Sequence, residues 1–160
     1  MKGLLSSKDV IESLDIHSQK NNYAARLHKI LLRDCKKMNY ETLIADELRS
    51  LRKENILCVL ATDNMDCFAE SIDSIPGLEE LFDVVLCSSE IGVLKSEDPN
   101  RFFTDWLYAN GIDPRKALLL DDSAKNCKQF RKIGGRAILV NETETAIDGI
   151  RKWKTEISRG

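Results

Sequence analysis

Helical periodicities and short apolar runs alternate along most of this chain. From residue 40 onward, amphipathic segments precede unbroken apolar runs of the kind found in strands that are buried on both faces. The pattern predicts strands at Ile56–Ala61, Val84–Cys87, Ala117–Leu120 and Arg136–Val140. It predicts helices at Glu41–Glu54, Cys67–Ser74 and Leu78–Phe82, between Pro99 and Gly111, between Ala124 and Ile133, and at Glu144–Ile157. Such alternation indicates an α/β fold with a doubly wound parallel sheet.

In the first 39 residues the pattern predicts helices but no strand. Ser6 and Asp9 have the spacing of a capping box, which opens a short helix containing Val10, Ile11 and Leu14. A second amphipathic helix carries apolar residues at helical spacing, namely Tyr23, Leu27, Ile30, Leu31, Cys35 and Met38. The chain is therefore predicted to consist of a helical region, residues 1–39, and an α/β core, residues 40–160.

Composition and charge exclude several classes of function. The 160 residues suffice for one domain with a real core, and 42% of them are hydrophobic. A net charge of −2 provides no basic field for nucleic acid. No apolar run approaches the roughly 18 residues of a membrane span, and the N-terminus lacks the apolar core of a signal peptide. We therefore expect a cytoplasmic protein with neither a nucleic-acid nor a membrane partner.

The cysteines and histidines give no sign of a metal or nucleophile site. The five cysteines are odd in number, widely spaced and without a C-x-x-C pair. This favours reduced thiols that act as small core residues over a zinc site. His17 and His28 lie in the polar N-terminal third, where each is predicted to be a surface helix residue.

Two adjacent carboxylates follow the predicted strand that ends at Leu120. Asp121 and Asp122 lie at its carboxyl end, where open α/β sheets place their ligands. Adjacent carboxylates repel each other unless a cation or a shared proton intervenes, so the pair is a candidate site for a hard metal. The alternative is an acidic helix start, with Asp122 or Ser123 as the N-cap and Asp121 solvated.

Two further polar residues follow other strands. Thr62, with Asp63 and Asn64 after it, ends the first predicted strand, and Lys95 lies in the loop after the second. A hydroxyl, an ammonium and metal-binding acids at one sheet edge are what phosphoryl binding requires. Taken singly, a threonine at a strand end is usually a cap and a loop lysine is usually solvated.

The order of these residues resembles the haloacid dehalogenase (HAD) superfamily of phosphohydrolases, over about residues 40–140. Thr62 in CVLATDN resembles its second motif, Lys95 in SSEIGVLKSEDPNRFF its third, and the acid pair in LLLDDSAKN the double-acid form of its fourth. The resemblance implies a Rossmann-like core, the N-terminal helices being a partial cap. It implies that Thr62, with Asp63 and Asn64, binds the phosphate of a small phosphorylated molecule. Lys95 would pair with the phosphate, and Asp121 and Asp122 would hold Mg²⁺.

The first motif of that family, a strand ending in Asp-x-Asp, is missing from this sequence. Its first aspartate would be the nucleophile and its second the acid/base. Smaller departures are Ser96, where the family has proline, and Cys127, where many members have another acid. The missing strand would be central, between the strands that end near Thr62 and Asp121. Those strands could pair directly, or the N-terminal segment or another chain could fill the place. We favour a truncated or degenerate family member.

Three functions follow from this combination. The first is a Mg²⁺-dependent phosphatase for a small phosphorylated metabolite, impaired or inactive because no nucleophile is visible. The second is a non-catalytic module that binds phosphate or metal. The third is an interaction protein that self-associates through surface exposed by the missing strand, which makes a homodimer the expected assembly.

Overall fold

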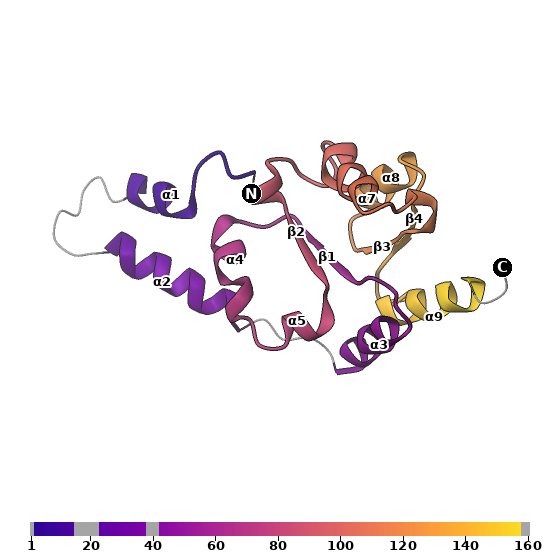
Figure 1. The fold of residues 1–160 in the computed structure, drawn as a ribbon. Helices are drawn as coiled ribbons and strands as arrows, with labels where there is room; N and C mark the ends of the chain where they lie inside the picture. Colours follow the sequence, from indigo (N-terminus) through magenta and orange to yellow (C-terminus); the bar gives the residue numbers. More distant parts are fainter. Residues whose placement is uncertain (1, 15–22, 38–41, 158–160) are drawn as a thin grey trace. The chain divides into compact units, whose positions relative to one another are not determined.

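The structure is a computed structural model that describes residues 2–14, 23–37 and 42–157 (Figure 1). The chain divides into two compact units. The first comprises Met1–Tyr40 and Leu51–Val93, and the second comprises Glu41–Ser50 and Leu94–Gly160. Each unit contains one two-stranded parallel sheet. The α/β class and the parallel strands predicted from the sequence are therefore confirmed.

The first unit is built on strands β1 (Val59–Thr62) and β2 (Val84–Cys87). They pair in parallel, with Thr62 opposite Cys87, so both strands end at the same edge. Short helical segments connect and follow them: α4 (Asp66–Ser71), η1 (Ile72–Ser74), α5 (Leu78–Leu81) and α6 (Ser88–Ile91). Phe68, Ile75 and Leu78 pack with Cys87 in the core of this unit.

Two N-terminal helices, α1 (Ser7–Leu14) and α2 (Tyr23–Cys35), complete the first unit. The predicted capping box is confirmed, because Ser6 Oγ accepts from the Asp9 amide and Asp9 Oδ2 accepts from the Ser6 amide, each at 3.0 Å. The Asp66 carboxylate accepts from the Ser7 amide at 2.9 and 3.0 Å, which ties α1 to the start of α4. His28 is a partly buried residue of α2, whereas His17 lies outside the described residues.

The second unit is built on strands β3 (Leu118–Asp121) and β4 (Arg136–Leu139), which pair in parallel with Asp121 opposite Leu139. Its helical segments are η2 (Asn100–Thr104), α7 (Asp105–Ala109), η3 (Pro114–Lys116), α8 (Ala124–Lys132) and α9 (Ala146–Ile157). The Phe103 ring packs against Phe102 and Phe130, with ring centroids 4.8 Å apart in both pairs. This aromatic cluster, Phe102, Phe103 and Phe130, is buried in the unit.

Helix α3 (Thr42–Lys53) has residues in both units. Its part in the second unit contacts α9, where the Arg151 guanidinium donates to Glu47 at 2.8 Å and Lys154 Nζ donates to Ser50 Oγ at 3.3 Å. The sequence predicted this helix from its stripe of apolar residues. The contacts with α9 join segments about a hundred positions apart in the sequence, and no local sequence pattern predicted them.

The observed elements differ from the predicted ones in boundaries and in two added turns. Strands β1 and β3 each end one residue later than predicted, at Thr62 and Asp121. Helix α6 and the turn η3 were not predicted. Gly92, at φ 83°, ends α6, and the Asp113 side chain accepts from the Arg115 amide at the start of η3. Within the described residues β1 pairs with β2, and β3 pairs with β4.

No helix in the described part of the chain is both long enough and apolar enough to cross a membrane.

Gly135, between α8 and β4, lies against the Phe130 ring, and a Cβ built on it would overlap that ring. Gly135→Ala should lower the free energy of unfolding by about 2 kcal/mol, because Phe130 is held edge-on by Phe103 and cannot move aside. Denaturant unfolding measures the loss. In the double variant with Phe130→Leu, the combined loss should be smaller than the sum of the single losses. Strictly additive losses would contradict this steric account.

Candidate functional site

A buried ion pair lies at the carboxyl end of β3. Lys95 Nζ is 2.6 Å from Asp121 Oδ2, and the two side chains are 11% and 4% exposed. Lys95 comes from the loop after α6, and Asp121 is the last residue of β3. Because removing two charges from water costs several kcal/mol per ion, a pair this deeply buried needs further hydrogen bonds to be tolerated.

Asn126 and Ser123 provide those hydrogen bonds to the Asp121 carboxylate. The Asn126 amide group donates to both carboxylate oxygens, at 3.1 and 3.2 Å, and the Ser123 backbone amide donates to Oδ1 at 2.8 Å. Both Asp121 oxygens are therefore engaged by protein donors. Asn126 is not among the site residues predicted from the sequence. The sequence feature that could have indicated this role is the position of Asn126 in the first turn of α8, from which a side chain can reach the end of the preceding strand.

Ser123 also starts α8, since its Oγ accepts from the Asn126 backbone amide at 3.3 Å. Of the two caps considered above, the structure therefore selects Ser123. This local cap fixes the first turn of the helix, and with it the Asn126 side chain that holds Asp121. The cap interpretation is therefore confirmed for Ser123, but its expectation that Asp121 is solvated is wrong, because Asp121 is buried beside Lys95.

Asp122 differs from its neighbour in being exposed. Asp121 is the last residue of β3 and is buried, whereas Asp122 lies in the bend after the strand and is exposed. Among the described residues no group of three or more histidine, cysteine or acidic side chains is arranged to hold a metal ion. Mg²⁺ commonly binds proteins through one or two carboxylates, with water and phosphate oxygens as its other ligands. Asp122 suits that mode, and Asp121, committed to Lys95 and Asn126, suits it less.

Cys127 packs behind this cluster. Its thiol donates to the backbone oxygens of Asp121 and Ile138, both at 3.5 Å, and the residue has no exposed surface. Burial is the main reason that the pKa of the Cys127 thiol is raised, and the neighbouring Asp121 charge adds to it. The thiol is thus a core group that supports the end of β3 from within.

Thr62, Asp63 and Asn64 belong to the first unit, at the end of β1. Ser88 fixes this turn, because its Oγ accepts from the Asn64 amide at 3.0 Å and donates to the Asn64 carbonyl at 3.2 Å. Asn64 Oδ1 accepts from the Met65 amide at 2.8 Å. Lys95 and Asp121 therefore lie together in the second unit. The turn that follows Thr62 belongs to the first unit, where Ser88 holds it by hydrogen bonds.

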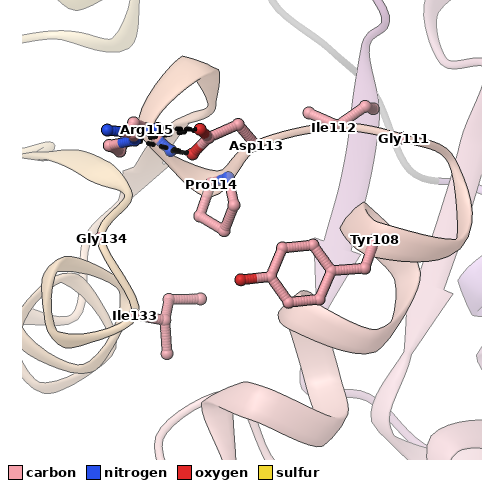
Figure 2. A pocket seen from close by; sticks show the side chains of 8 residues that line it. All are labelled: Tyr108, Gly111, Ile112, Asp113, Pro114, Arg115, Ile133 and Gly134. Atoms are coloured by element: carbon pink, nitrogen blue, oxygen red, sulfur yellow. Dashed lines mark hydrogen bonds and ion pairs between the residues drawn. The ribbon is translucent and has the colours of Figure 1, made fainter.

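A cavity of about 610 Å³ lies elsewhere in the second unit (Figure 2). Its lining residues are Tyr108, Gly111, Ile112, Asp113, Pro114, Arg115, Ile133 and Gly134. Several of them directly precede β3 and β4, so the cavity lies toward the amino ends of these strands and contains none of the predicted site residues. The Arg115 guanidinium hydrogen-bonds Asp113 and holds the pKa of that carboxyl at about 2. Both charges are thereby committed to each other.

Solved structures with the same fold are HAD proteins. A HAD family enzyme from Bacteroides thetaiotaomicron, crystallised with magnesium and inorganic phosphate, matches with a TM-score of 0.71 and 20% identity over 91% of this chain and 75% of its own. A predicted HAD-like family hydrolase from Porphyromonas gingivalis matches with a TM-score of 0.73 and 19% identity over 96% of this chain and 75% of its own. No family model and no curated protein matches the chain. The fold is therefore HAD-like, as the resemblance implied.

Lys95→Met should lower the free energy of unfolding by about 3 kcal/mol, because it leaves the Asp121 carboxylate buried without its cation. Denaturant unfolding measures the effect, and Lys125→Met, at an exposed lysine of α8, should change stability by less than about 0.5 kcal/mol. Adding Asp121→Asn to Lys95→Met should recover part of the loss, since the uncompensated charge disappears. A double variant as unstable as the sum of both single variants would contradict the ion-pair explanation.

Proposed function

We propose that this HAD-like chain binds Mg²⁺ and the phosphate of a small phosphorylated metabolite at the carboxyl end of β3. The HAD-like fold supports a function of the Mg²⁺-dependent phosphohydrolase type, and in this proposal the chain by itself does not turn substrate over. The observation that carries the proposal is the buried Lys95–Asp121 pair, held by Asn126, next to the exposed carboxylate of Asp122.

Lys95 is proposed to neutralise the phosphate. A flexible lysine at a surface would lose considerable side-chain entropy on binding an anion. Here Asp121 fixes the ammonium at 2.6 Å, so that ordering has already occurred in the folded protein. A cation held at the strand end, where parallel sheets place their ligands, is suited to a phosphate group. Asp121 thus acts on the ligand through Lys95.

Asp122 is proposed as the principal Mg²⁺ ligand among the two predicted acids. Its exposed carboxylate lets the ion keep most of its water and accept phosphate oxygens, which is the usual coordination of Mg²⁺ at phosphate sites. Bound Mg²⁺ would supply charge neutralisation at the phosphoryl oxygens. The Bacteroides enzyme, which has the same fold, was crystallised with magnesium and phosphate, and this supports Mg²⁺ and phosphate as the molecules bound here.

Thr62, Asp63 and Asn64 stay predicted phosphate-binding residues on the strength of the sequence motif. The ordered turn that Ser88 holds is compatible with that role. The cytoplasmic location and the homodimer are also sequence predictions. Lack of turnover is proposed because the sequence has no strand ending in Asp-x-Asp, and so has no aspartate placed to form a phosphoaspartyl intermediate. The proposed function is therefore that of a non-catalytic module that binds phosphate and metal.

Magnesium and inorganic phosphate together should stabilise the protein. At 10 mM Mg²⁺ and a dissociation constant of about 1 mM, linkage predicts about 1.4 kcal/mol, or roughly 3–5 °C in Tm. Thermal unfolding with and without the ligands measures this. Asp122→Asn should abolish the shift, and Asp105→Asn, at an exposed acid of the same unit, should retain it. An undiminished shift in Asp122→Asn would mean that the metal binds elsewhere.

Hydrolysis of a generic aryl phosphate in the presence of Mg²⁺ tests the second half of the proposal. The chain should show no more turnover than its Asp122→Asn variant, with folding of both checked by circular dichroism. Mg²⁺-dependent turnover that disappears in Asp122→Asn would show that a nucleophile is present. The claim of inactivity would then fall, while the assignment of the Mg²⁺ site would stand.

A further inference from the structure

Helix α2 is amphipathic, yet none of its residues is buried. It packs against α1 and α4 in the first unit, where Figure 1 shows the three helices close together. Its side chains Tyr23 and Ile30 are nevertheless 58% and 42% exposed. Because they are seven positions apart, they lie on the same face of the helix. Two large apolar side chains on one face of α2 thus remain largely in contact with water.

The same face of α2 is basic. Arg26 and Arg33 lie four positions before and three positions after Ile30, and both are exposed. Residues 23–37 contain five bases and one acid, Asp34. Asp34 lies 3.4 Å from the Arg33 guanidinium, but an exposed pair of this kind contributes little to stability. Tyrosine and arginine are enriched where proteins bind each other. We call four residues the α2 face: Tyr23, Arg26, Ile30 and Arg33.

The rest of the first unit carries the opposite charge. Residues 54–94 contain nine acids and no lysine, arginine or histidine. Some of these acids are used within the unit, as Asp83 is by Arg52 at 2.8 Å. Three others are exposed on η1 and α5, two short segments that contact each other. We call these three residues the acidic edge: Asp73, Glu79 and Glu80.

We propose that the α2 face of one chain binds the acidic edge of a second copy of the chain. Complementary charge identifies this partner, because the chain itself carries an exposed acidic surface that matches the basic helix. Both surfaces belong to the first unit, so a two-fold dimer would form the same contact twice. Burial of Tyr23 and Ile30 would supply affinity, and the charges would set the orientation.

Other partners of the α2 face are less favourable. Two α2 faces placed against each other would bring their bases together. An anionic membrane or a nucleic acid would attract α2, but the acids of residues 54–94 would repel it, and the chain has a net charge of −2. An acidic protein surface can instead be matched locally. The contact also differs from the strand edge considered in the sequence analysis, since it uses a helix face.

Sedimentation velocity of the full chain tests the proposal. Between about 1 and 200 μM in 50 mM NaCl, the chain should pass from monomer to dimer. The dissociation constant should rise roughly tenfold in 500 mM NaCl, because salt screens exposed charges. Ile30→Ser should weaken the dimer at low salt by roughly tenfold. Leu43→Ser, at another exposed apolar residue, should leave it unchanged.

Charge reversal identifies the two surfaces. Arg26→Glu with Arg33→Glu, and separately Asp73→Lys with Glu79→Lys, should each abolish the dimer, since like charges then meet. An equimolar mixture of these two double variants should restore it, because every contact in the mixed dimer is again between opposite charges. Lys125→Glu with Lys128→Glu makes the same change in net charge on exposed residues of α8, and should keep the dimer. Circular dichroism checks that every variant is folded.

Three outcomes would overturn the proposal. The chain could stay monomeric up to 200 μM in 50 mM NaCl. A dimer could persist in both double variants, which would place the interface elsewhere. The mixture could stay monomeric although both variants are folded. A monomeric chain that sediments with vesicles of phosphatidylserine and phosphatidylcholine, and no longer does so with Arg26→Glu and Arg33→Glu, would assign the α2 face to a membrane instead.

Discussion

The buried Lys95–Asp121 ion pair is the constraint on which the arrangement of the second unit depends. Neither charge can stay at this depth alone, so the loop that carries Lys95 must meet the end of β3. The same requirement draws in the Asn126 side chain and the Ser123 amide, and with them the start of α8. Gln129 adds a second tie, donating to the Ser96 carbonyl at 3.3 Å. The buried ion pair and its hydrogen bonds thereby hold together a strand, a loop and a helix.

The ion pair also makes the two adjacent acids, Asp121 and Asp122, different from each other. Both carboxylate oxygens of Asp121 accept from protein donors, whereas Asp122 is exposed. Identical side chains one residue apart thus have different surroundings, since the first ends a buried strand and the second lies in the exposed bend after it. The HAD-like fold supplies the strand end, and the residues of this chain decide which acid is structural.

The first unit rests on apolar packing and local hydrogen bonds. Buried Phe68, Ile75 and Leu78 hold α4 and α5 on β1 and β2, and Ser88 fixes the turn after Thr62. Cys35 packs against this core, and its helix α2 packs against α4.

The sequence alone determined the α/β class, the parallel strands, the Ser6–Asp9 capping box and the placement of Thr62, Lys95 and Asp121 after strands. These features follow from local periodicity and from short-range hydrogen bonding, which residues near one another in the chain decide. Only the tertiary structure decided that Asp121 pairs with Lys95 and that Asn126 donates to the Asp121 carboxylate. Each of these depends on burial and on partners from distant segments. Side-chain chemistry offers candidates for such contacts, and packing selects among them.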